Sequence, residues 1–297
     1  MSDLAKPKTE VSPDTQAAAT RFGMIGVVVE NLESSYITEV IRGIDAELSE
    51  AGWNLILCTT HLRDQTDESF VTQLSVGFCD GLLVLLPTRP ERYSEQLAES
   101  DLPFVVLDHI GSDIASSLVA QNEEGAYAAT MHLGSLGHRR IGFVTGELSM
   151  ASGRDRLLGY KRALAELGAD TDPTLIVTAN FLESDGRRAA HQLLDLAKPP
   201  TAIFASSDAS AFGVIKAAAS RGLRVPNDLS VVGFDDIPEA ASILPPLTTV
   251  RQPIRDMGRI GARMLLERVS NPDTPVQHEE LPTELIIRRS TRQPTVR

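Results

Sequence analysis

The chain has 297 residues, with a hydrophobic fraction of 42% and a charged fraction of 23%, values typical of a globular protein large enough for two packed lobes. Its net charge of −12, with only short basic runs, disfavours DNA binding by this chain unaided, because a nucleic-acid surface needs clustered Lys and Arg. No apolar run approaches a membrane span, and residues 1–22 lack the apolar centre of a secretory signal, so we expect a cytoplasmic protein without membrane contact.

The chain begins with a polar stretch, residues 1–21, which predicts a flexible tail. From Phe22 onward, short β-branched runs alternate with helical periods. A first series of alternating strands and helices is predicted at 23–29, 36–48, 53–58, 65–77, 80–86, 92–100, 104–108 and 123–136. A second series is predicted at 140–145, 154–167, 174–178, 184–197, 201–205, 209–221 and 229–234. Two consecutive runs of strand–helix units indicate an α/β protein with two doubly wound, mostly parallel sheets.

Glycines mark the predicted helix ends. Gly52, Gly137, Gly168 and Gly222 each stand just beyond a helical period, where a left-handed residue commonly ends a helix.

The last part of the chain breaks the alternation. An extended run at 245–250 precedes a helix at 254–269 and a strand at 283–289. A late helix and strand after two finished sheets suggest that the chain crosses back, near 139–140, 248–250 and 272–282. We therefore predict an N-terminal lobe of residues 22–139 and 250–275 and a C-terminal lobe of 140–249 and 276–297.

Polar residues follow several predicted strands. In open parallel sheets ligands bind at the carboxyl ends of strands, which here carry Asp108, Ser207 and Asp235. Such groups suit a ligand rich in hydroxyls or amides. For Ser207 capping of the next helix is an equally good interpretation. Asp235 and Asp236 could form a catalytic pair, but adjacent residues at a strand end point in different directions, which favours binding.

Enzyme signatures are missing from the sequence. There is no GxGxxG after the first strand, no GxxxxGK[ST] and no GxSxG. The six histidines show neither HxxxH spacing nor a cysteine partner, and Cys58 and Cys79 lie in apolar segments that predict buried reduced thiols. We expect no catalytic residues, no metal site, no cofactor and no enzyme activity.

Four segments resemble a known family. LGHRRIGFVTG at 136–146, RLLGYKRAL at 156–164, VPNDLSVVGFDDIP at 225–238 and PPLTTVRQP at 245–253 are similar to segments of the LacI/GalR family of bacterial transcriptional regulators. The match runs from about Met24 to Ser290 in the right order. The resemblance implies the type I periplasmic-binding-protein fold, in which two Rossmann-like lobes are joined by three crossovers. It also implies an effector held between the lobes, and a homodimer.

The resemblance also assigns site residues. Arg156 corresponds to the arginine that clamps ligand oxygens, although it could instead be a surface helix residue paired with an acid. Asp235 corresponds to the acid that accepts ligand hydrogen bonds. Tyr36 stands where the family has an aromatic against the ligand, and core packing explains it equally well. The predicted ligand-binding set is Tyr36, His61, Asp108, Arg156, Ser207 and Asp235.

The chain departs from the family at several of these positions. His61 replaces an acid after the second strand, and Ser206-Ser207-Asp208 replaces Ala-Asn-Asp. A simple pentose or hexose is therefore not a safe inference for the ligand.

The segment before the first strand is too short for the three helices of the family's DNA-binding headpiece. We expect the helix-turn-helix to be absent or truncated, with DNA reached only through an upstream segment or a partner. Residues 11–15 resemble the start of the headpiece's third helix, but Ser12 and Pro13 also make an ordinary helix start.

The predicted function is the effector-sensing core of a LacI/GalR-type regulator. It would bind a sugar, nucleoside or similar small polar ligand and change lobe closure. The alternative is a solute-binding receptor of a transporter, which shares the fold but would require export.

Overall fold

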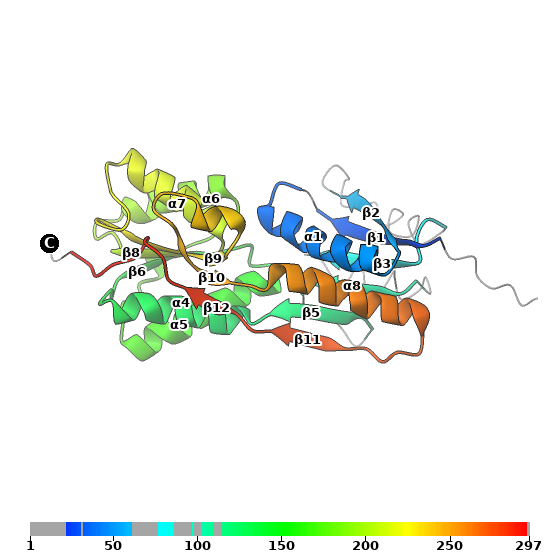
Figure 1. The fold of residues 1–297 in the computed structure, drawn as a ribbon. Helices are drawn as coiled ribbons and strands as arrows, with labels where there is room; N and C mark the ends of the chain where they lie inside the picture. The colour runs from blue at the N-terminus through cyan, green and yellow to red at the C-terminus, as the bar shows by residue number, and fades with distance from the viewer. Residues whose placement is uncertain are drawn as a thin grey trace, which may run out of the picture.

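The computed structural model describes residues 22–30, 32–60, 77–85, 97, 102–109 and 114–295. The described strands form two six-stranded sheets, each in its own lobe, and the lobes lie end to end along the long axis of the molecule (Figure 1). The two doubly wound lobes predicted from the alternation of strands and helices are confirmed. Among the described helices none is both long and apolar enough to cross a membrane.

The N-terminal lobe contains a parallel sheet in the order β11-β5-β4-β3-β1-β2. Its strands are β1 (Met24–Val29), β2 (Asn54–Thr59), β3 (Gly81–Leu85), β4 (Phe104–Leu107), β5 (Ser116–Ala120) and β11 (His278–Leu281). Helices α1 (Ser35–Glu50) and α8 (Ile254–Ser270) pack against each other and bury their apolar faces over this sheet. The Ser34 hydroxyl caps α1 by accepting the Tyr36 N–H.

The C-terminal lobe contains a sheet in the order β12-β10-β9-β8-β6-β7, in which only β12 is antiparallel to its neighbour among the described pairings. Its strands are β6 (Ile141–Val144), β7 (Ile176–Val177), β8 (Ala202–Ala205), β9 (Ser230–Asp235), β10 (Thr248–Arg251) and β12 (Glu284–Ile286). Its helices are α4 (Asn122–Ser135), α5 (Ala151–Leu167), α6 (Glu183–Leu194), α7 (Asp208–Ser220) and the short 3₁₀ turns η1 (Pro173–Leu175) and η2 (Pro238–Ala241). Two apolar clusters fill this lobe, one on each face of the sheet.

Within the described residues, three connections pass between the lobes: 120–122 from β5 to α4, 251–254 from β10 to α8, and 281–284 from β11 to β12 (Figure 1). Two of them run together, since the Gln121 N–H donates to the Leu281 carbonyl at 2.8 Å. The three crossovers implied by the family resemblance are therefore present.

The lobe boundaries differ from the predicted ones at three places. Helix α4 packs on α5 and so belongs to the C-terminal lobe, and β10 stays in the C-terminal sheet through Arg251. Strand β11, predicted in the C-terminal lobe, pairs with β5 in the N-terminal sheet. A chain that crosses back and forth leaves no local signal of the lobe to which each segment returns.

Two strands, β5 and β11, are missing from the predicted elements. Strand β11 reads HEEL and is mostly exposed, so it lacks an apolar alternation, and β5 opens with two serines. The predicted tail at 1–21 lies outside the described residues. So do all but the last residue of the predicted helix at 65–77 and all but Leu97 of the helix at 92–100.

The contact between α1 and α8 depends on two glycines. A Cβ on Gly43 would stand 2.1 Å from the Arg255 carbonyl oxygen, and one on Gly258 would stand 2.2 Å from the Val40 carbonyl oxygen. We expect Gly258→Ala to force the helices apart and lower the free energy of unfolding by about 1–3 kcal/mol. Urea unfolding measures this change, with Ser49→Ala on the exposed face of α1 as the control. Equal stability of Gly258→Ala and the wild type would contradict this close packing.

Candidate functional site

Four of the predicted ligand residues come together between the lobes, and we call them the interlobe site: Tyr36, Asp108, Arg156 and Asp235. Tyr36 lies in the first turn of α1, and Asp108 directly follows β4, so both belong to the N-terminal lobe. Arg156 on α5 and Asp235 at the end of β9 belong to the C-terminal lobe. The charges of Asp108, Asp235 and Arg156 all act on the Tyr36 hydroxyl, which places the four groups within electrostatic range of one another.

Arg156 is held at the centre of this site by contacts on every side. The residue is 3% exposed, and its Nε donates to Asn122 Oδ1 at 2.8 Å, while Nη1 donates to the Ser206 carbonyl. The guanidinium lies 3.8 Å from the centre of the Phe234 ring and forms an ion pair with Asp235 at 3.6 Å. The alternative of a surface helix residue is incompatible with this burial.

Asp235 and Asp236 point in different directions, as predicted for adjacent residues at a strand end. Asp235 accepts the side-chain amide of Gln252 at 2.7 Å and faces Arg156, whereas Asp236 pairs with Arg251 and Arg288. Both have positive φ, 123° for Asp235 and 59° for Asp236, so the backbone turns sharply here. Burial raises the pKa of Asp235 to about 6, although the positive charge of Arg156 opposes the shift.

Asp108 faces the site from the opposite lobe. It also has a positive φ, 60°, and it is 5% exposed. Burial raises the pKa of its carboxyl to about 7, with Arg156 opposing the shift and Asp235 adding to it. Its Oδ1 has no hydrogen-bond partner. A buried carboxylate oxygen without a donor is costly, and a ligand N–H or O–H would satisfy it.

The core packing that was one of the two interpretations of Tyr36 is observed, and ligand contact by it stays a prediction. Its ring packs in the apolar core of the N-terminal lobe, and its hydroxyl donates to Met257 Sδ at 3.9 Å. Burial, together with the charges of Asp108 and Asp235, raises its pKa well above the ordinary value. The hydroxyl is therefore un-ionised at neutral pH and can serve as a donor.

Ser207 makes contacts of its own, with the N-terminus of α7 and with Phe181. The Ser207 hydroxyl caps α7 by accepting the Ser210 N–H at 3.0 Å, and it donates to the Phe181 carbonyl at 2.8 Å. Helix capping thus accounts for Ser207, and ligand contact by it stays a prediction. His61 lies outside the described residues.

Supporting residues around the site were not among the predicted ligand contacts. Asn122 and Gln252 lie in two of the crossovers and hold Arg156 and Asp235 by side-chain hydrogen bonds. Asp208 is fully buried, and its carboxylate accepts the Ile237 N–H and the Thr249 hydroxyl, which anchors the turn that carries Asp235. The motifs that contain these residues were visible in the sequence, but their pairing depends on the tertiary structure.

Phe181 lies over Gly146 and beside Arg156. A Cβ on Gly146 would stand 1.9 Å from the Phe181 ring, so a glycine is needed there, and the ring centre is 5.5 Å from the Arg156 guanidinium. No motif or residue spacing in the sequence predicted that Phe181 would lie at the site.

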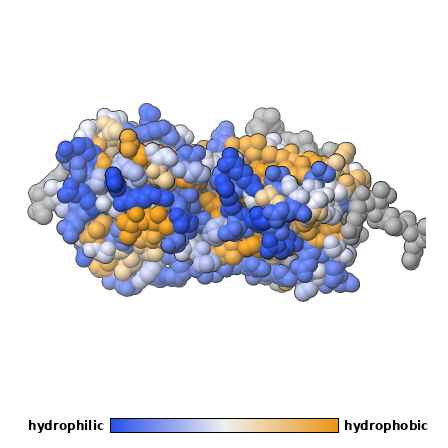
Figure 2. Space-filling model, viewed as in Figure 1, coloured by the Kyte–Doolittle hydropathy of each residue, from blue (hydrophilic) through white to orange (hydrophobic). Residues whose placement is uncertain are grey.

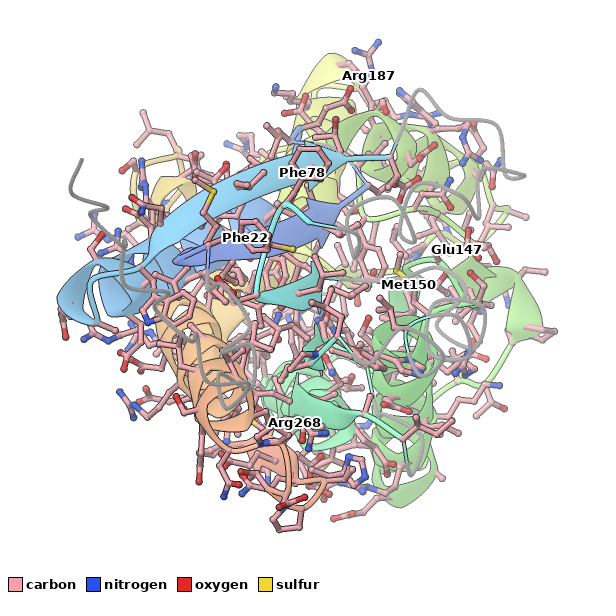
Figure 3. The ribbon with its side chains drawn as sticks, turned by 90° about the vertical axis from the view of Figure 1, so that its right-hand side faces the viewer. Phe22, Phe78, Glu147, Met150, Arg187 and Arg268 are labelled. Atoms are coloured by element: carbon pink, nitrogen blue, oxygen red, sulfur yellow. The ribbon has the colours of Figure 1, made fainter. Side chains whose placement is uncertain are left out.

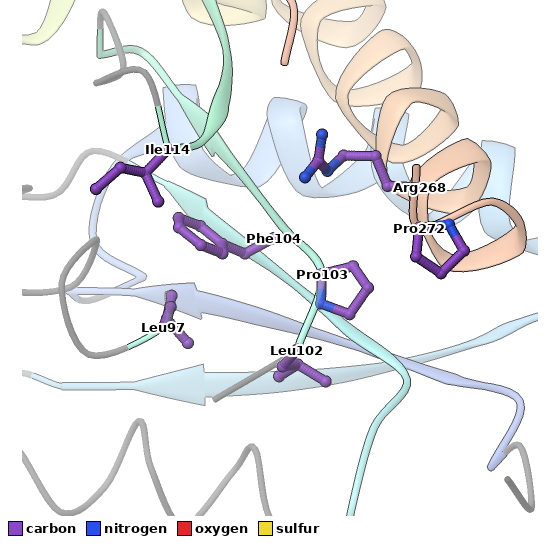
Figure 4. Close-up of a pocket in the computed structure, with 7 residues that line it drawn as sticks. All are labelled: Leu97, Leu102, Pro103, Phe104, Ile114, Arg268 and Pro272. Carbon is purple, nitrogen blue, oxygen red and sulfur yellow. The ribbon is translucent and has the colours of Figure 1, made fainter. Parts of the chain in front are cut away.

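A separate pocket of about 280 Å³ lies in the N-terminal lobe, away from the interlobe site (Figure 4). Its lining is mostly apolar and consists of Leu97, Leu102, Pro103, Phe104, Ile114, Arg268 and Pro272. Figure 3 views the molecule from this lobe and labels Arg268 at the α8 end and the exposed Phe22 and Phe78 near β1 and β2. None of the five predicted ligand residues that the structure describes lines this pocket. Among the described residues no cluster of His, Cys, Asp or Glu could hold a metal ion.

Known proteins share this architecture. Residues 130–291 match the family of periplasmic binding protein-like domains. The chain is 35% identical over 269 residues to the HTH-type transcriptional repressor PurR of Vibrio atlanticus, covering 90% of this chain and 80% of the repressor. A Haemophilus influenzae PurR is 33% identical over 273 residues, with 90% and 81% covered.

Solved structures agree with these relatives. A transcriptional regulator CelR–cellobiose complex superimposes with a TM-score of 0.85 at 31% identity, over 91% of this chain and 85% of that one. A LacI family regulator from Enterococcus faecium with bound ribose gives 0.83 at 29% identity, over 92% and 100%. The chain therefore belongs to the periplasmic binding protein-like domain family and is an effector-binding core of the LacI type.

Proposed function

We propose that the chain senses a small polar effector between its lobes and passes the signal on through lobe closure and dimer geometry, as part of a transcriptional regulator working in the cytoplasm. The observation that carries this proposal is the buried Arg156 facing Asp235 from one lobe and Asp108 from the other, with Asp108 Oδ1 left without a donor. A ligand with hydroxyl or amine groups would supply the missing donor to Asp108. Ligand contacts from Tyr36, His61 and Ser207 are part of the same proposal.

The relatives support a regulator over a transporter receptor. Both PurR relatives are transcriptional repressors, and the two ligand-bound structures are a regulator with cellobiose and a regulator with ribose. By analogy with these structures, we propose that the ligand of this chain has the polarity of a sugar or a nucleoside. Because the relatives are regulators and the interlobe site holds paired binding groups, binding without turnover is the function we assign.

Contacts across the lobes give closure a structural basis. The Ser35 hydroxyl of the N-terminal lobe donates to the Glu239 carboxylate of the C-terminal lobe at 2.9 Å. Ile237, which directly precedes η2 in the C-terminal lobe, packs into the apolar core of the N-terminal lobe. Phe212 on α7 contacts the apolar cores of both lobes. These contacts would break if the lobes separated, so a ligand that binds residues of both lobes favours the arrangement in which they persist.

The surface is consistent with the proposed homodimer. Leu244 is 87% exposed and Phe78 is 61% exposed, and contact with a second copy would cover such apolar side chains. Figure 2 shows hydrophobic residues gathered at the upper edge of the N-terminal lobe, beside β2. Sedimentation velocity at micromolar concentration measures the oligomeric state, and a monomer would contradict this part of the proposal.

A thermal-shift screen tests the effector proposal. Sugars, nucleosides and polyols, with cellobiose and ribose among them, are added to the wild type, to Asp235→Asn and to Asp236→Asn. A ligand that binds only the native state raises the Tm by mass action. We expect the ligand-induced rise to be lost in Asp235→Asn and kept in Asp236→Asn, because Asp236 points to Arg251 and Arg288 instead. A rise that is the same in all three proteins would place the ligand elsewhere.

A further inference from the structure

The pocket in the N-terminal lobe lies at the end of that lobe opposite to the interlobe site. Phe104 opens β4, and the other end of the same strand leads to Asp108 of the interlobe site. Arg268 lies in the last turn of α8, whose first turn follows the crossover at 251–254. The far ends of these elements therefore form a cavity for which the proposed effector site does not account.

The walls of this pocket are apolar apart from one cation. Leu97 and Phe104 are 1% and 5% exposed, whereas Ile114, at 46%, lies at the rim. Among the described lining residues, Arg268 is the one with a charged side chain, and none is an acid. Figure 4 shows the Arg268 side chain extending from α8 toward Phe104 and Ile114. The volume of about 280 Å³ lies just below the roughly 300–1,000 Å³ of drug-sized sites, so the pocket suits a compact molecule.

Arg268 differs from the other arginines of α8. Arg255, Arg259 and Arg263 follow one another at intervals of four residues, so they share a helix face, on which they pair with glutamates of α1. Arg268 comes five residues after Arg263, which turns it about 140° around the helix from that face. It forms no ion pair with any residue that the structure describes. Its positive charge is therefore left for another partner.

The Arg268 guanidinium also has hydrogen-bonding capacity left over. Its Nη1 donates to the Thr274 carbonyl at 3.0 Å, which holds the turn that follows α8. Its Nε is buried and donates to no partner among the described residues. A buried donor without an acceptor costs free energy, and a ligand that supplies the acceptor recovers it.

The apolar walls select among the anions that a guanidinium can bind. A phosphate or sulfate carries further oxygens, which the described walls would leave without donors, at a cost in free energy. A carboxylate has only two oxygens, and one planar guanidinium can donate to both in parallel. The rest of such a ligand can then be apolar, like the walls around it.

We propose that this pocket is a binding site, separate from the interlobe site, for a small monocarboxylate with an apolar body, such as an aromatic or branched aliphatic acid. The carboxylate accepts from Arg268 Nε, and the apolar body packs against Leu97 and Phe104. Because the ion pair and the apolar burial act together, neither a neutral analogue nor a bare carboxylate binds as well. The proposal does not depend on the effector-sensing function.

Ligand-observed NMR titrations of the full chain at neutral pH test the ligand class. The probes are benzoate and cyclohexanecarboxylate, with benzamide as the ring without the charge and acetate as the charge without the ring. We expect both ring carboxylates to bind, and benzamide and acetate to bind at least about tenfold more weakly. Equal binding of benzoate and benzamide would overturn the pairing with Arg268. Failure of both ring carboxylates to bind at millimolar concentration would overturn the site itself.

Variants of Arg268 locate the bound carboxylate. Arg268→Gln removes the charge, and we expect at least about tenfold weaker benzoate binding. Arg268→Lys keeps the charge without the Nε donor and is expected to recover only part of the affinity. Arg263→Gln is the matched control, because Arg263 lies on the same helix but pairs with Glu47, and it is expected to bind benzoate as the wild type does. Unchanged benzoate affinity in Arg268→Gln would place the probe elsewhere and refute the proposal.

The comparison of benzoate with benzamide uses the unaltered chain, so it tests the pairing even if Arg268→Gln folds poorly.

Discussion

Replacement of Arg156 by alanine is expected to weaken effector binding by about 1.5–3 kcal/mol, or about 10- to 150-fold, the scale of a hydrogen bond to a charged group. The guanidinium is the cation that balances Asp235, with which it pairs at 3.6 Å. It is also oriented by Asn122, so its donors are already aimed before a ligand arrives. Isothermal titration calorimetry, performed below the melting temperature of every variant, measures the loss.

The same replacement is expected to lower stability. Without Arg156 the buried Asp235 would lose its cation, and the Ser206 carbonyl and Asn122 would lose a donor. Breaking a buried pair from one side costs about 3–5 kcal/mol. Arg156→Lys distinguishes the contribution of the positive charge from that of the hydrogen-bond geometry. Lysine keeps the charge but lacks the planar guanidinium that reaches Asn122 and Ser206 together. We expect Arg156→Lys to recover part of the stability and little of the affinity.

Arg162→Ala is the matched control for both measurements. Arg162 lies on the same helix but pairs with the exposed Glu123 and Glu124. Exposed ion pairs contribute at most about 1 kcal/mol each, so the control is expected to change stability little and affinity not at all. Equal effector affinity in Arg156→Ala and Arg162→Ala would contradict the assignment of Arg156 as a ligand-binding residue.

Replacement of Asp108 by asparagine is expected to stabilise the ligand-free protein strongly at pH 8 and much less at pH 5. Burial raises the pKa of Asp108 to about 7 in the folded chain, well above the value of about 3.9 for an unfolded aspartate. Between these two values the folded state binds the proton more tightly than the unfolded state does. The contribution of Asp108 to stability therefore falls as pH rises from about 4 to about 7, and above that range the folded chain holds a buried negative charge.

Asparagine resembles the protonated form of aspartate in size and polarity and does not ionise in this range. The difference in unfolding free energy between Asp108→Asn and the wild type is expected to grow by ~2–4 kcal/mol from pH 5 to pH 8. Urea unfolding at a series of pH values measures it. Asp45→Asn, at an exposed position on α1, serves as the control and should show no such growth. A stability difference for Asp108→Asn that does not vary with pH would show that the carboxyl ionises normally.

Local sequence patterns were sufficient to predict most of the secondary structure. The β-branched runs became the central strands of both sheets, and the helical periods became α1 and α4 to α8. The glycines predicted to end helices have positive φ: 76° at Gly52, 98° at Gly137, 56° at Gly168 and 71° at Gly222. Such features depend on neighbouring residues, so they can be predicted from the sequence alone.

The candidate site was predictable only in part. Motifs and strand ends indicated Arg156, Asp108 and Asp235, and the structure brings them together with Tyr36. The contacts of Asn122 and Gln252 were not predictable, because each hydrogen bond joins residues far apart in the chain, 34 positions for Asn122 and Arg156 and 17 for Gln252 and Asp235.

The sequence by itself determined the class of fold, the family and the net charge of −12. Only the tertiary structure decided which lobe holds α4 and β11, and that Ser207 caps a helix. It also decided that carboxylates from two lobes share one buried arginine. Propensity and periodicity act over a few residues, whereas burial, charge balance and unsatisfied acceptors arise only when distant segments pack together.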